Sequence, residues 1–231
     1  MVSKPSDTAT ESRPALAPEI GVLLSGGLDS SILIGHLLAQ GRLVQPFYIQ
    51  CGLYWENTEL AAARSFLRVL PTTSLRNLVT LALPLDDVYQ GHWSITGRDI
   101  PNADSPDEAV FLPGRNALLI IKAAIWCQLH GVEQLALAPL ASNPFSDASD
   151  PFFAHLQSAL SYTGRRLEIL RPFGNLKKTQ VMHLGRDLPL ELTFSCISPL
   201  HGVHCGRCNK CAERKQAFVA AEMTDPTRYD K

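Results

Sequence analysis

The chain has 231 residues, of which 45% are hydrophobic and 19% charged, and its 21 basic and 22 acidic side chains give a formal charge of −1. A chain of this length and composition can bury a full hydrophobic core, which excludes a disordered or fibrous protein. Because a near-neutral protein lacks the positive field that holds a phosphate backbone, we do not expect nucleic acid as a direct partner.

The apolar runs of the chain are short. The longest, at 117–121 and 135–140, fall well below the roughly 20 residues that span a bilayer, so no membrane helix is expected. Residues 1–18 lack the apolar stretch of a secretory signal. We therefore expect a flexible N-terminal tail at 1–18 and a cytoplasmic protein.

Strand-like and helix-like patterns alternate along the chain. In chain order they predict a strand at 19–25, a helix from 29 or 30 to 41, a strand at 43–50, a helix at 55–70, a strand at 78–83, a helix at 116–130, a strand at 134–139, a helix at 151–162, a strand at 167–170 and a helix at 177–187. This alternation predicts an α/β domain at 19–190 with a parallel sheet and helices on both faces, followed by a smaller lobe at 191–231. Residues 84–113, about 30 residues rich in Asp, Gly and Pro, are too long for a simple connection, and we expect them to form a lid or a pocket wall.

A glycine loop, Ser25-Gly-Gly-Leu-Asp-Ser30, joins the first strand to the first helix. Two interpretations are open: a plain turn capped by Ser and Asp, or a phosphate site in which Cβ-free backbone and helix amides face anionic oxygens. Its place at the carboxyl end of a strand favours the phosphate site. The loop has neither the lysine motif of Walker ATPases nor the spacing of dinucleotide-binding loops. Asp29 would either hold Mg²⁺ or cap the helix.

The hexapeptide resembles the S-G-G-x-D-S signature of the PP-loop ATP pyrophosphatases, which split ATP between its α and β phosphates to adenylate a substrate. The resemblance implies an adenylating ligase that uses ATP and Mg²⁺. It also implies that the nucleotide contacts the residues of the loop, which are Leu24, Ser25, Gly26, Gly27, Leu28, Asp29 and Ser30.

Four of the six cysteines follow the spacing C-x8-C-x2-C-x2-C and are Cys196, Cys205, Cys208 and Cys211. Four thiolates can close a tetrahedral structural Zn²⁺ site, although an iron–sulfur cluster and redox disulfides remain alternatives. A site with four protein ligands has no open position for water, so we assign it to holding a C-terminal ribbon rather than to chemistry. We expect His201 and His204 at the rim of this site and Cys127 in the core.

Five blocks resemble the 7-cyano-7-deazaguanine synthases, a family within the PP-loop superfamily. They are LLSGGLDSS at 23–31, FLPGRN at 111–116, RPFGNLKKTQV at 171–181, LELTFSC at 190–196 and HCGRCNKCAERKQAF at 204–218. The resemblance implies a five-stranded parallel sheet with helices on both faces, the adenine nucleotide alpha hydrolase-like fold, and a C-terminal Cys₄ zinc lobe.

The resemblance also implies the reaction. Members of the family convert 7-carboxy-7-deazaguanine to the nitrile with ammonia and ATP, by way of an acyl-adenylate and an amide. The implied partners are a deazapurine-like carboxylate, ammonia and a second copy of the chain in a homodimer.

The matched blocks supply the catalytic candidates. Besides Ser25, Asp29 and Ser30, they are Arg115, whose guanidinium can grip a phosphate or carboxylate, and Lys178, a compact cation for the α-phosphate. Arg115 and its neighbour Asn116 are also expected to contact the nucleotide, and Lys177 is expected to face solvent.

Two segments depart from the family pattern. Residues 49–55 lack the histidine of the family's Tyr-Gly-Gln-x-His stretch, and residues 143–150 replace the stretch that cradles the deazapurine. A different carboxylate substrate is therefore one alternative. A second is an ATP-dependent tRNA thiolase that uses Cys51, and a third is a non-catalytic zinc interaction module.

Overall fold

The computed structural model describes residues 18–70 and 73–230, so the expected tail lies, apart from Pro18, outside the described residues. Its centre is a five-stranded parallel sheet in the order β3-β2-β1-β4-β5. The strands are β1 (Glu19–Leu23), β2 (Leu43–Gln50), β3 (Val79–Ala82), β4 (Gln134–Ala136) and β5 (Glu168–Leu170). The predicted five-stranded parallel sheet is thus confirmed.

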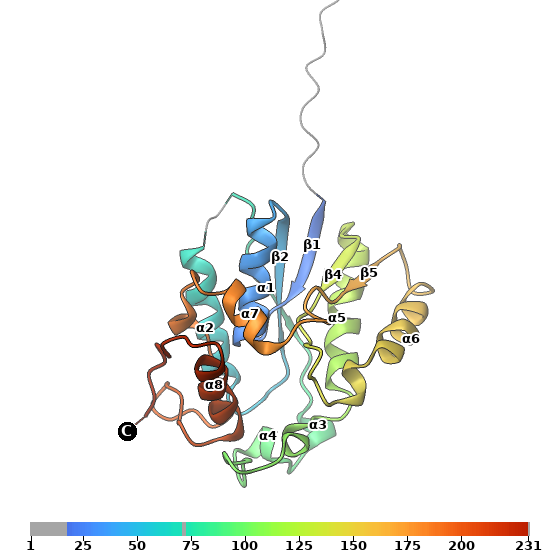
Figure 1. Cartoon of the computed structure of the whole chain (residues 1–231). Coiled ribbons are helices and arrows are strands. Elements are labelled where there is room, and N and C mark those ends of the chain that lie inside the picture. Colours follow the sequence, from blue (N-terminus) through green and yellow to red (C-terminus); the bar gives the residue numbers. More distant parts are fainter. Residues whose placement is uncertain (1–17, 71–72, 231) are drawn as a thin grey trace, which may run out of the picture.

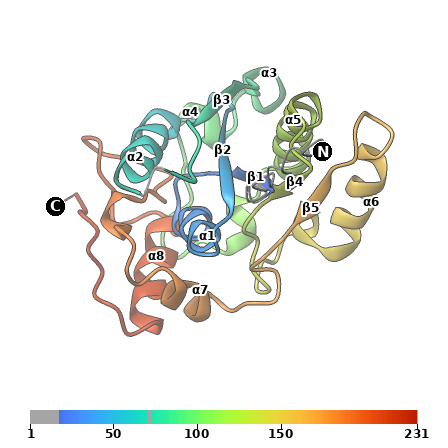
Figure 2. The same ribbon diagram turned by 90° about the horizontal axis from the view of Figure 1, so that it is seen from above.

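Helices cover both faces of the sheet (Figures 1 and 2). One face carries α1 (Leu28–Ala39), α2 (Glu56–Val69), α7 (Lys178–Leu184) and α8 (Asn209–Ala220). The other face carries α5 (Arg115–His130) and α6 (Asp150–Leu160). The predicted strand at 134–139 and helix at 177–187 are both shorter in the structure.

The alternation of side chains along β1 explains the two cores. Ile20 and Val22 are fully buried on the α1 face. On the other face Gly21 leaves room for α5, because a Cβ there would lie 2.8 Å from Phe47 Cε2 and 3.1 Å from Cys127 Sγ. Cys127 is therefore a core residue, as predicted.

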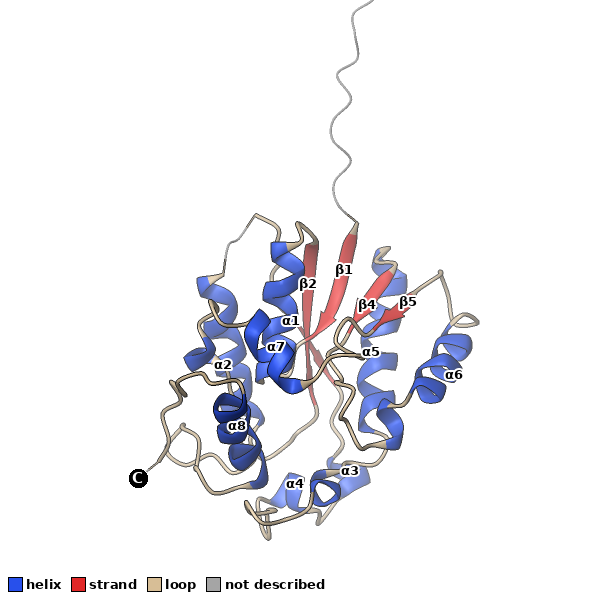
Figure 3. Cartoon of the chain, in the orientation of Figure 1, coloured by secondary structure: helices blue, strands red, loops and turns tan. Residues whose placement is uncertain are grey.

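The segment between β3 and α5 is more ordered than the sequence indicated (Figure 3). It forms two single-turn helices, α3 (Asp86–Tyr89) and α4 (Trp93–Thr96), and a 3-10 turn, η1 (Asp107–Val110). His92 starts α4, since its Nδ1 accepts a hydrogen bond from the Ser94 amide at 3.3 Å. Each of these turns is too short to show a helical period, so none of them could be predicted from the sequence pattern.

The cysteine-rich end of the chain is not a ribbon, and that expectation is wrong. Cys208 is the N-cap of α8, and Cys211 lies in the first helical turn. The helix formers that follow, Ala212 to Gln216, extend the helix past the glycines and cysteines that suggested turns. The boundary between 190 and 191 stays a prediction. No helix of the described residues is both long and apolar enough to cross a membrane.

Candidate active site

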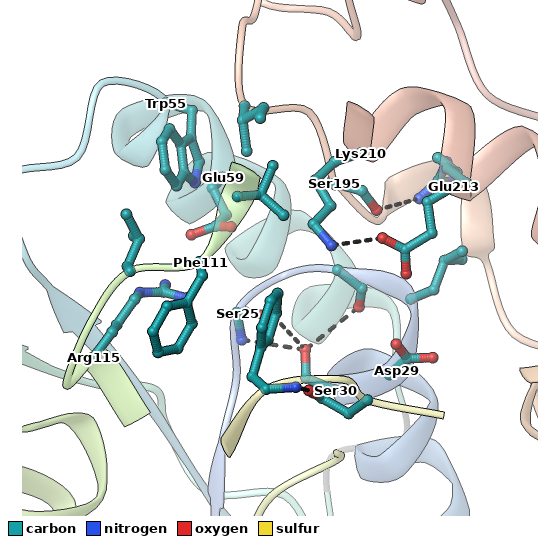
Figure 4. A pocket seen from close by; sticks show the side chains of 18 of the residues that line it. Ser25, Asp29, Ser30, Trp55, Glu59, Phe111, Arg115, Ser195, Lys210 and Glu213 are labelled. Carbon is teal, nitrogen blue, oxygen red and sulfur yellow. Dashed lines mark hydrogen bonds and ion pairs between the residues drawn. The ribbon is translucent and has the colours of Figure 1, made fainter. Parts of the chain in front are cut away.

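The glycine loop leaves β1 at its carboxyl end, between β2 and β4, where the strand order reverses and open α/β sheets bind ligands. Gly26 has φ +75°, a conformation that favours glycine. Gly27 is the N-cap of α1 and supplies no side chain to cap it, which leaves the first-turn amides of a 12-residue helix open to a ligand. Ser25 and Ser30 close the loop, with their Oγ atoms 3.0 Å apart (Figure 4).

Two adjoining cavities meet at this loop. The first has a volume of about 290 Å³ and the second about 230 Å³. The predicted residues that line at least one of them are Leu24, Ser25, Gly27, Leu28, Asp29, Ser30, Arg115, Asn116 and Lys178. Gly26 shapes the loop from outside this lining, and its carbonyl accepts a hydrogen bond from the Phe194 amide at 2.7 Å.

Asp29 and Lys178, 149 residues apart in the chain, form an ion pair beside the loop. Lys178 Nζ lies 2.8 Å from both carboxylate oxygens of Asp29. Lys178 is the first residue of α7, and both side chains keep about a quarter of their surface exposed. Lys177 is exposed, as predicted. The structure thus brings together two of the residues that the sequence selected, and their opposite charges neutralise each other.

Arg115 and Asn116 open α5 at the opposite side of the loop. Arg115 Nε is buried and has no hydrogen-bond partner among the described residues, so the guanidinium retains unused donor capacity beside both cavities. Asn116 Nδ2 instead donates to Asp147 Oδ1 at 3.1 Å. Burial raises the pKa of Asp147 despite that hydrogen bond. Whether Asn116 also contacts a nucleotide stays a prediction.

Aromatic side chains form one wall of the first cavity. Trp55 stacks on Trp93 with ring centroids 5.7 Å apart, and Phe111 stacks on Phe145 at 5.1 Å. The segment expected to be a lid or pocket wall supplies Trp93 and Phe111, and it is a wall. Both segments that depart from the family pattern face this cavity, through Trp55 and through Phe145 with Asp147.

Glu59 is a site residue that sequence reasoning missed. It lies in the first turn of α2, is buried and lines both cavities. Its Oε2 accepts a hydrogen bond from Tyr48 Oη at 2.7 Å. Burial raises the pKa of Glu59 to about 7, against the opposing influence of Arg115. A carboxyl group near neutrality beside the loop can take up or release a proton there.

Replacing Glu59 with glutamine should stabilise the protein more at high pH than at low pH. The unfolded carboxyl ionises near pH 4.5 and the folded one near pH 7, so the folded state holds the extra proton between these values. The contribution of Glu59 to stability is then highest below pH 4.5 and falls as the pH rises to about 7. Urea unfolding measures the free energy of unfolding of both proteins. The difference between Glu59→Gln and the wild type should shift by roughly 2 kcal/mol in favour of Glu59→Gln as the pH rises from 5 to 8. A difference independent of pH would contradict this.

The four predicted metal ligands form one buried cluster. Their sulfur atoms all lie within 4.8 Å of one another, with Cys196 Sγ 3.8 Å from Cys208 Sγ and Cys205 Sγ 4.0 Å from Cys211 Sγ. A tetrahedral ion with Zn–S bonds near 2.3 Å places its sulfurs roughly 3.8 Å apart, so the geometry fits Zn²⁺. Cys196 Sγ also accepts hydrogen bonds from the amides of Ser198 and Cys205, which suits a thiolate.

His204 is not a rim residue, which corrects the expectation. It is buried, and burial lowers its pKa to about 3, with the Arg214 charge acting in the same direction. Its neutral Nε2 accepts a hydrogen bond from the Ser195 amide at 3.1 Å. His201, in contrast, is exposed.

Arg214, also missed from the sequence, ties the cysteine lobe to the glycine loop. It is 1% exposed. Its guanidinium donates to Thr193 Oγ1 at 2.9 Å, to Ser195 Oγ at 3.2 Å and to Leu190 O at 2.9 Å. The segment held in this way includes Phe194, whose amide donates to Gly26. The position of the loop therefore depends on contacts made by α8.

Cys51 does not support the thiolase alternative. It is fully buried, its Sγ lies 3.7 Å from the Ile49 carbonyl, and it lies outside the linings of both cavities. Burial raises the pKa of its thiol to about 11, so the thiolate that a nucleophile needs is scarce at neutral pH.

A parallel α/β sheet whose first strand ends in an S-G-G-x-D-S loop beside a cavity defines a PP-loop nucleotide-binding protein. More narrowly, the chain belongs to the QueC family, because the family model of the queuosine biosynthesis protein QueC matches residues 19–222. The family resemblance predicted from the five sequence blocks is confirmed.

Two relatives illustrate the similarity. The 7-cyano-7-deazaguanine synthase of Anaeromyxobacter dehalogenans is 30% identical over 229 residues, which cover 91% of this chain and 95% of the relative. The enzyme of the same name from Syntrophobacter fumaroxidans is 29% identical over 230 residues, covering 90% and 94%. Among solved structures, a predicted tRNA methyltransferase subunit from Methanocaldococcus jannaschii aligns with a TM-score of 0.49 and 15% identity over 74% of this chain and 75% of that one, a similarity too low to bear on function.

Proposed function

We propose that this protein is an ATP-dependent carbon–nitrogen ligase that converts 7-carboxy-7-deazaguanine to 7-cyano-7-deazaguanine with ammonia. Its relatives over nine-tenths of the chain carry the name of that synthase. The observation that carries the proposal is the convergence of the glycine loop, Lys178 and Arg115 on one cavity in a member of the QueC family. Family membership does not favour the thiolase, and a cavity of about 290 Å³ beside the loop disfavours a purely structural zinc module.

The chemistry must turn a carboxylate oxygen into a leaving group. The substrate carboxylate attacks the α-phosphorus of ATP and pyrophosphate leaves; ammonia then displaces AMP and forms the amide. A second adenylation, on the amide oxygen, releases pyrophosphate, and loss of AMP and of both protons of the amide nitrogen then gives the nitrile. Each step develops negative charge on phosphate oxygens, which fixed cations and amide donors stabilise best in a site closed to water.

The residues of the site divide these tasks. We assign the phosphate chain to Ser25, Ser30 and the first-turn amides of α1, and the α-phosphate to Lys178. Arg115 has the free donor capacity to bind a phosphate or the substrate carboxylate. Glu59, with a pKa of about 7, is placed to accept a proton from ammonium near the aromatic wall.

Two metal ions belong to the proposal. Mg²⁺ prefers a carboxylate together with phosphate oxygens, and we assign it to Asp29, the carboxylate within the glycine loop. When bound, the ion neutralises phosphate charge. Cys196, Cys205, Cys208 and Cys211 would hold Zn²⁺, which fixes the lobe that carries Arg214. The homodimer and the cytoplasmic location stay predictions.

The decisive assay combines the purified protein with 7-carboxy-7-deazaguanine, ammonium chloride and Mg·ATP. Mass spectrometry should detect the nitrile, and two molecules of AMP should form for each nitrile. Omission of ammonium should leave AMP formation limited to adenylation of the acid. If neither AMP nor an aminated product forms under any of these conditions, the proposal is wrong.

Substitutions at Gly26 and Gly27 should distinguish an effect on the conformation of the loop from an effect on its contact with nucleotide. Gly26→Ala places a Cβ at positive φ and 3.1 Å from the Glu59 carbonyl, so we expect a loss of about 1–3 kcal/mol in stability. Gly27 has φ −73°, and its Cβ would lie 3.5 Å from Ser25 Oγ, at an ordinary contact distance inside the first cavity. Gly27→Ala should therefore unfold like the wild type but bind ATP more weakly. Thermal unfolding and calorimetric ATP titration distinguish the two, and a Gly27→Ala protein with unchanged affinity would contradict the proposed phosphate contact.

A further inference from the structure

A second ion pair faces the glycine loop from the cysteine lobe. Lys210 Nζ lies 2.6 Å from Glu213 Oε2, and both residues belong to α8. Figure 4 shows both side chains extending from α8 toward the loop of Ser25 and Ser30. Both line the first cavity and also a third cavity of about 340 Å³ that opens beside Asp29 and Lys178.

The contribution of this ion pair to folding stability is too small to explain its position. Partners three residues apart on a helix, with 30% and 46% of their side chains exposed, contribute only a few tenths of a kcal/mol to folding. Their position at the junction of two cavities is therefore better explained by a ligand than by the fold.

The charges around the loop are balanced in pairs. Asp29 neutralises Lys178, and Glu213 neutralises Lys210. Both pairs line the first and the third cavity, so the two ammonium groups and the two carboxylates face the same space. A phosphate chain that enters the cavity must therefore compete with a protein carboxylate for the ammonium group of Lys178 and for that of Lys210.

We propose that Lys210 is a second phosphate-binding cation, supplied by the cysteine lobe, and that Glu213 is an internal competitor that holds it until nucleotide binds. This inference rests on the proposed use of ATP and adds a residue to it. Binding transfers the ammonium of Lys210 from Glu213 to a phosphate oxygen. Because Lys210 lies between Cys208 and Cys211, the same lobe that binds metal then contacts the nucleotide directly.

The proposal predicts opposite effects from removing the two partners. Lys210→Met loses a charge-assisted hydrogen bond to phosphate, so the affinity for α,β-methylene-ATP with Mg²⁺ should fall about tenfold. Glu213→Gln removes the competitor, so the affinity should rise roughly threefold. A pair that only braces the helix would change affinity in neither direction or would lower it in both variants.

Isothermal titration calorimetry on the full chain measures these affinities, and thermal unfolding confirms that each variant is folded. Lys177→Met is the matched control, because it removes a positive charge next to Lys178 from an exposed side chain outside the cavities. The double variant Lys210→Met/Glu213→Gln should bind like Lys210→Met alone, since Glu213 acts only through Lys210.

The outcomes are separable. Opposite shifts in the two single variants, with no gain from Glu213→Gln in the Lys210→Met background, support the inference. Equal affinities, shifts of the same sign, or a gain from Glu213→Gln that survives without Lys210 overturn it while leaving the proposed function standing. A wild-type protein that binds no nucleotide overturns both.

Discussion

Replacing Cys208 with serine should release the metal and lower the free energy of unfolding by several kcal/mol. The four sulfurs already have the spacing of a tetrahedral site, so the loss of one ligand removes a quarter of the coordination shell. Structural zinc contributes on the order of 10–16 kcal/mol to the folding of isolated zinc-binding peptides, which is comparable with the total stability of a typical domain. The C-terminal lobe should therefore unfold or become labile.

The serine substitution also isolates the cause of that loss. Cys208 is the N-cap of α8, and serine is among the most favourable N-cap residues, so the start of the helix is not weakened by the change itself. Cys51→Ala is the matched control, because it removes a buried thiol that lies outside the cluster. Metal content by mass spectrometry and urea unfolding should change together in Cys208→Ser, whereas Cys51→Ala should keep its metal. A Cys208→Ser protein that retains one metal ion at full stability would rule out the assigned site.

The same substitution should weaken nucleotide binding at a distance. Arg214 lies one helical turn beyond Cys211 and holds the segment whose Phe194 amide donates to Gly26. A displaced α8 would release that segment and Lys210 together. Loss of metal is therefore expected to lower the affinity for ATP, although none of the four cysteines lines the first two cavities.

The parts of the fold that the sequence predicted are those determined by local patterns. The second strand at 43–50 matches β2, because an apolar run bounded by Gly41 and Gly52 leaves no other element that fits. The glycine loop was located by its own residues. Helix α8 was missed because the glycines and cysteines before it suggested turns, while its helix formers follow without an apolar period.

The site residues that escaped prediction are charged side chains on the helices α2 and α8. Glu59 and Arg214 are of the types that normally face solvent, so their sequence positions give no sign of burial. Their roles arise from partners on other elements of the fold: Tyr48 on β2 for Glu59, and the carbonyl of Leu190 for Arg214. The first pairing forms only when α2 packs against the sheet, and the second only when α8 packs against the segment that begins at Leu190. Lys178, by contrast, could be selected only through the family resemblance, since one of two adjacent lysines has no local mark of its role.

Replacing Lys178 with methionine should reduce the rate of AMP formation about 10²- to 10³-fold, the usual effect of removing one charge-stabilising donor from a reaction site. Methionine keeps an apolar side chain of similar length at the start of α7, and only the ammonium group that pairs with Asp29 at 2.8 Å is lost. The variant should therefore fold normally. Single-turnover formation of [³²P]AMP from α-labelled ATP measures the effect on adenylation apart from later steps.

Two further variants locate the origin of that loss. Without Lys178, the carboxylate of Asp29 remains beside the phosphate chain and repels it, so Lys178→Met/Asp29→Asn should recover the affinity for ATP measured without Mg²⁺. Its rate of AMP formation should stay low, because the ammonium group and the proposed Mg²⁺ ligand are both absent. Lys177→Met, which removes the neighbouring exposed charge, should form AMP at the wild-type rate. A Lys178→Met rate within threefold of the wild type would show that the loop and Arg115 suffice, and the α-phosphate would then have to be assigned to Arg115.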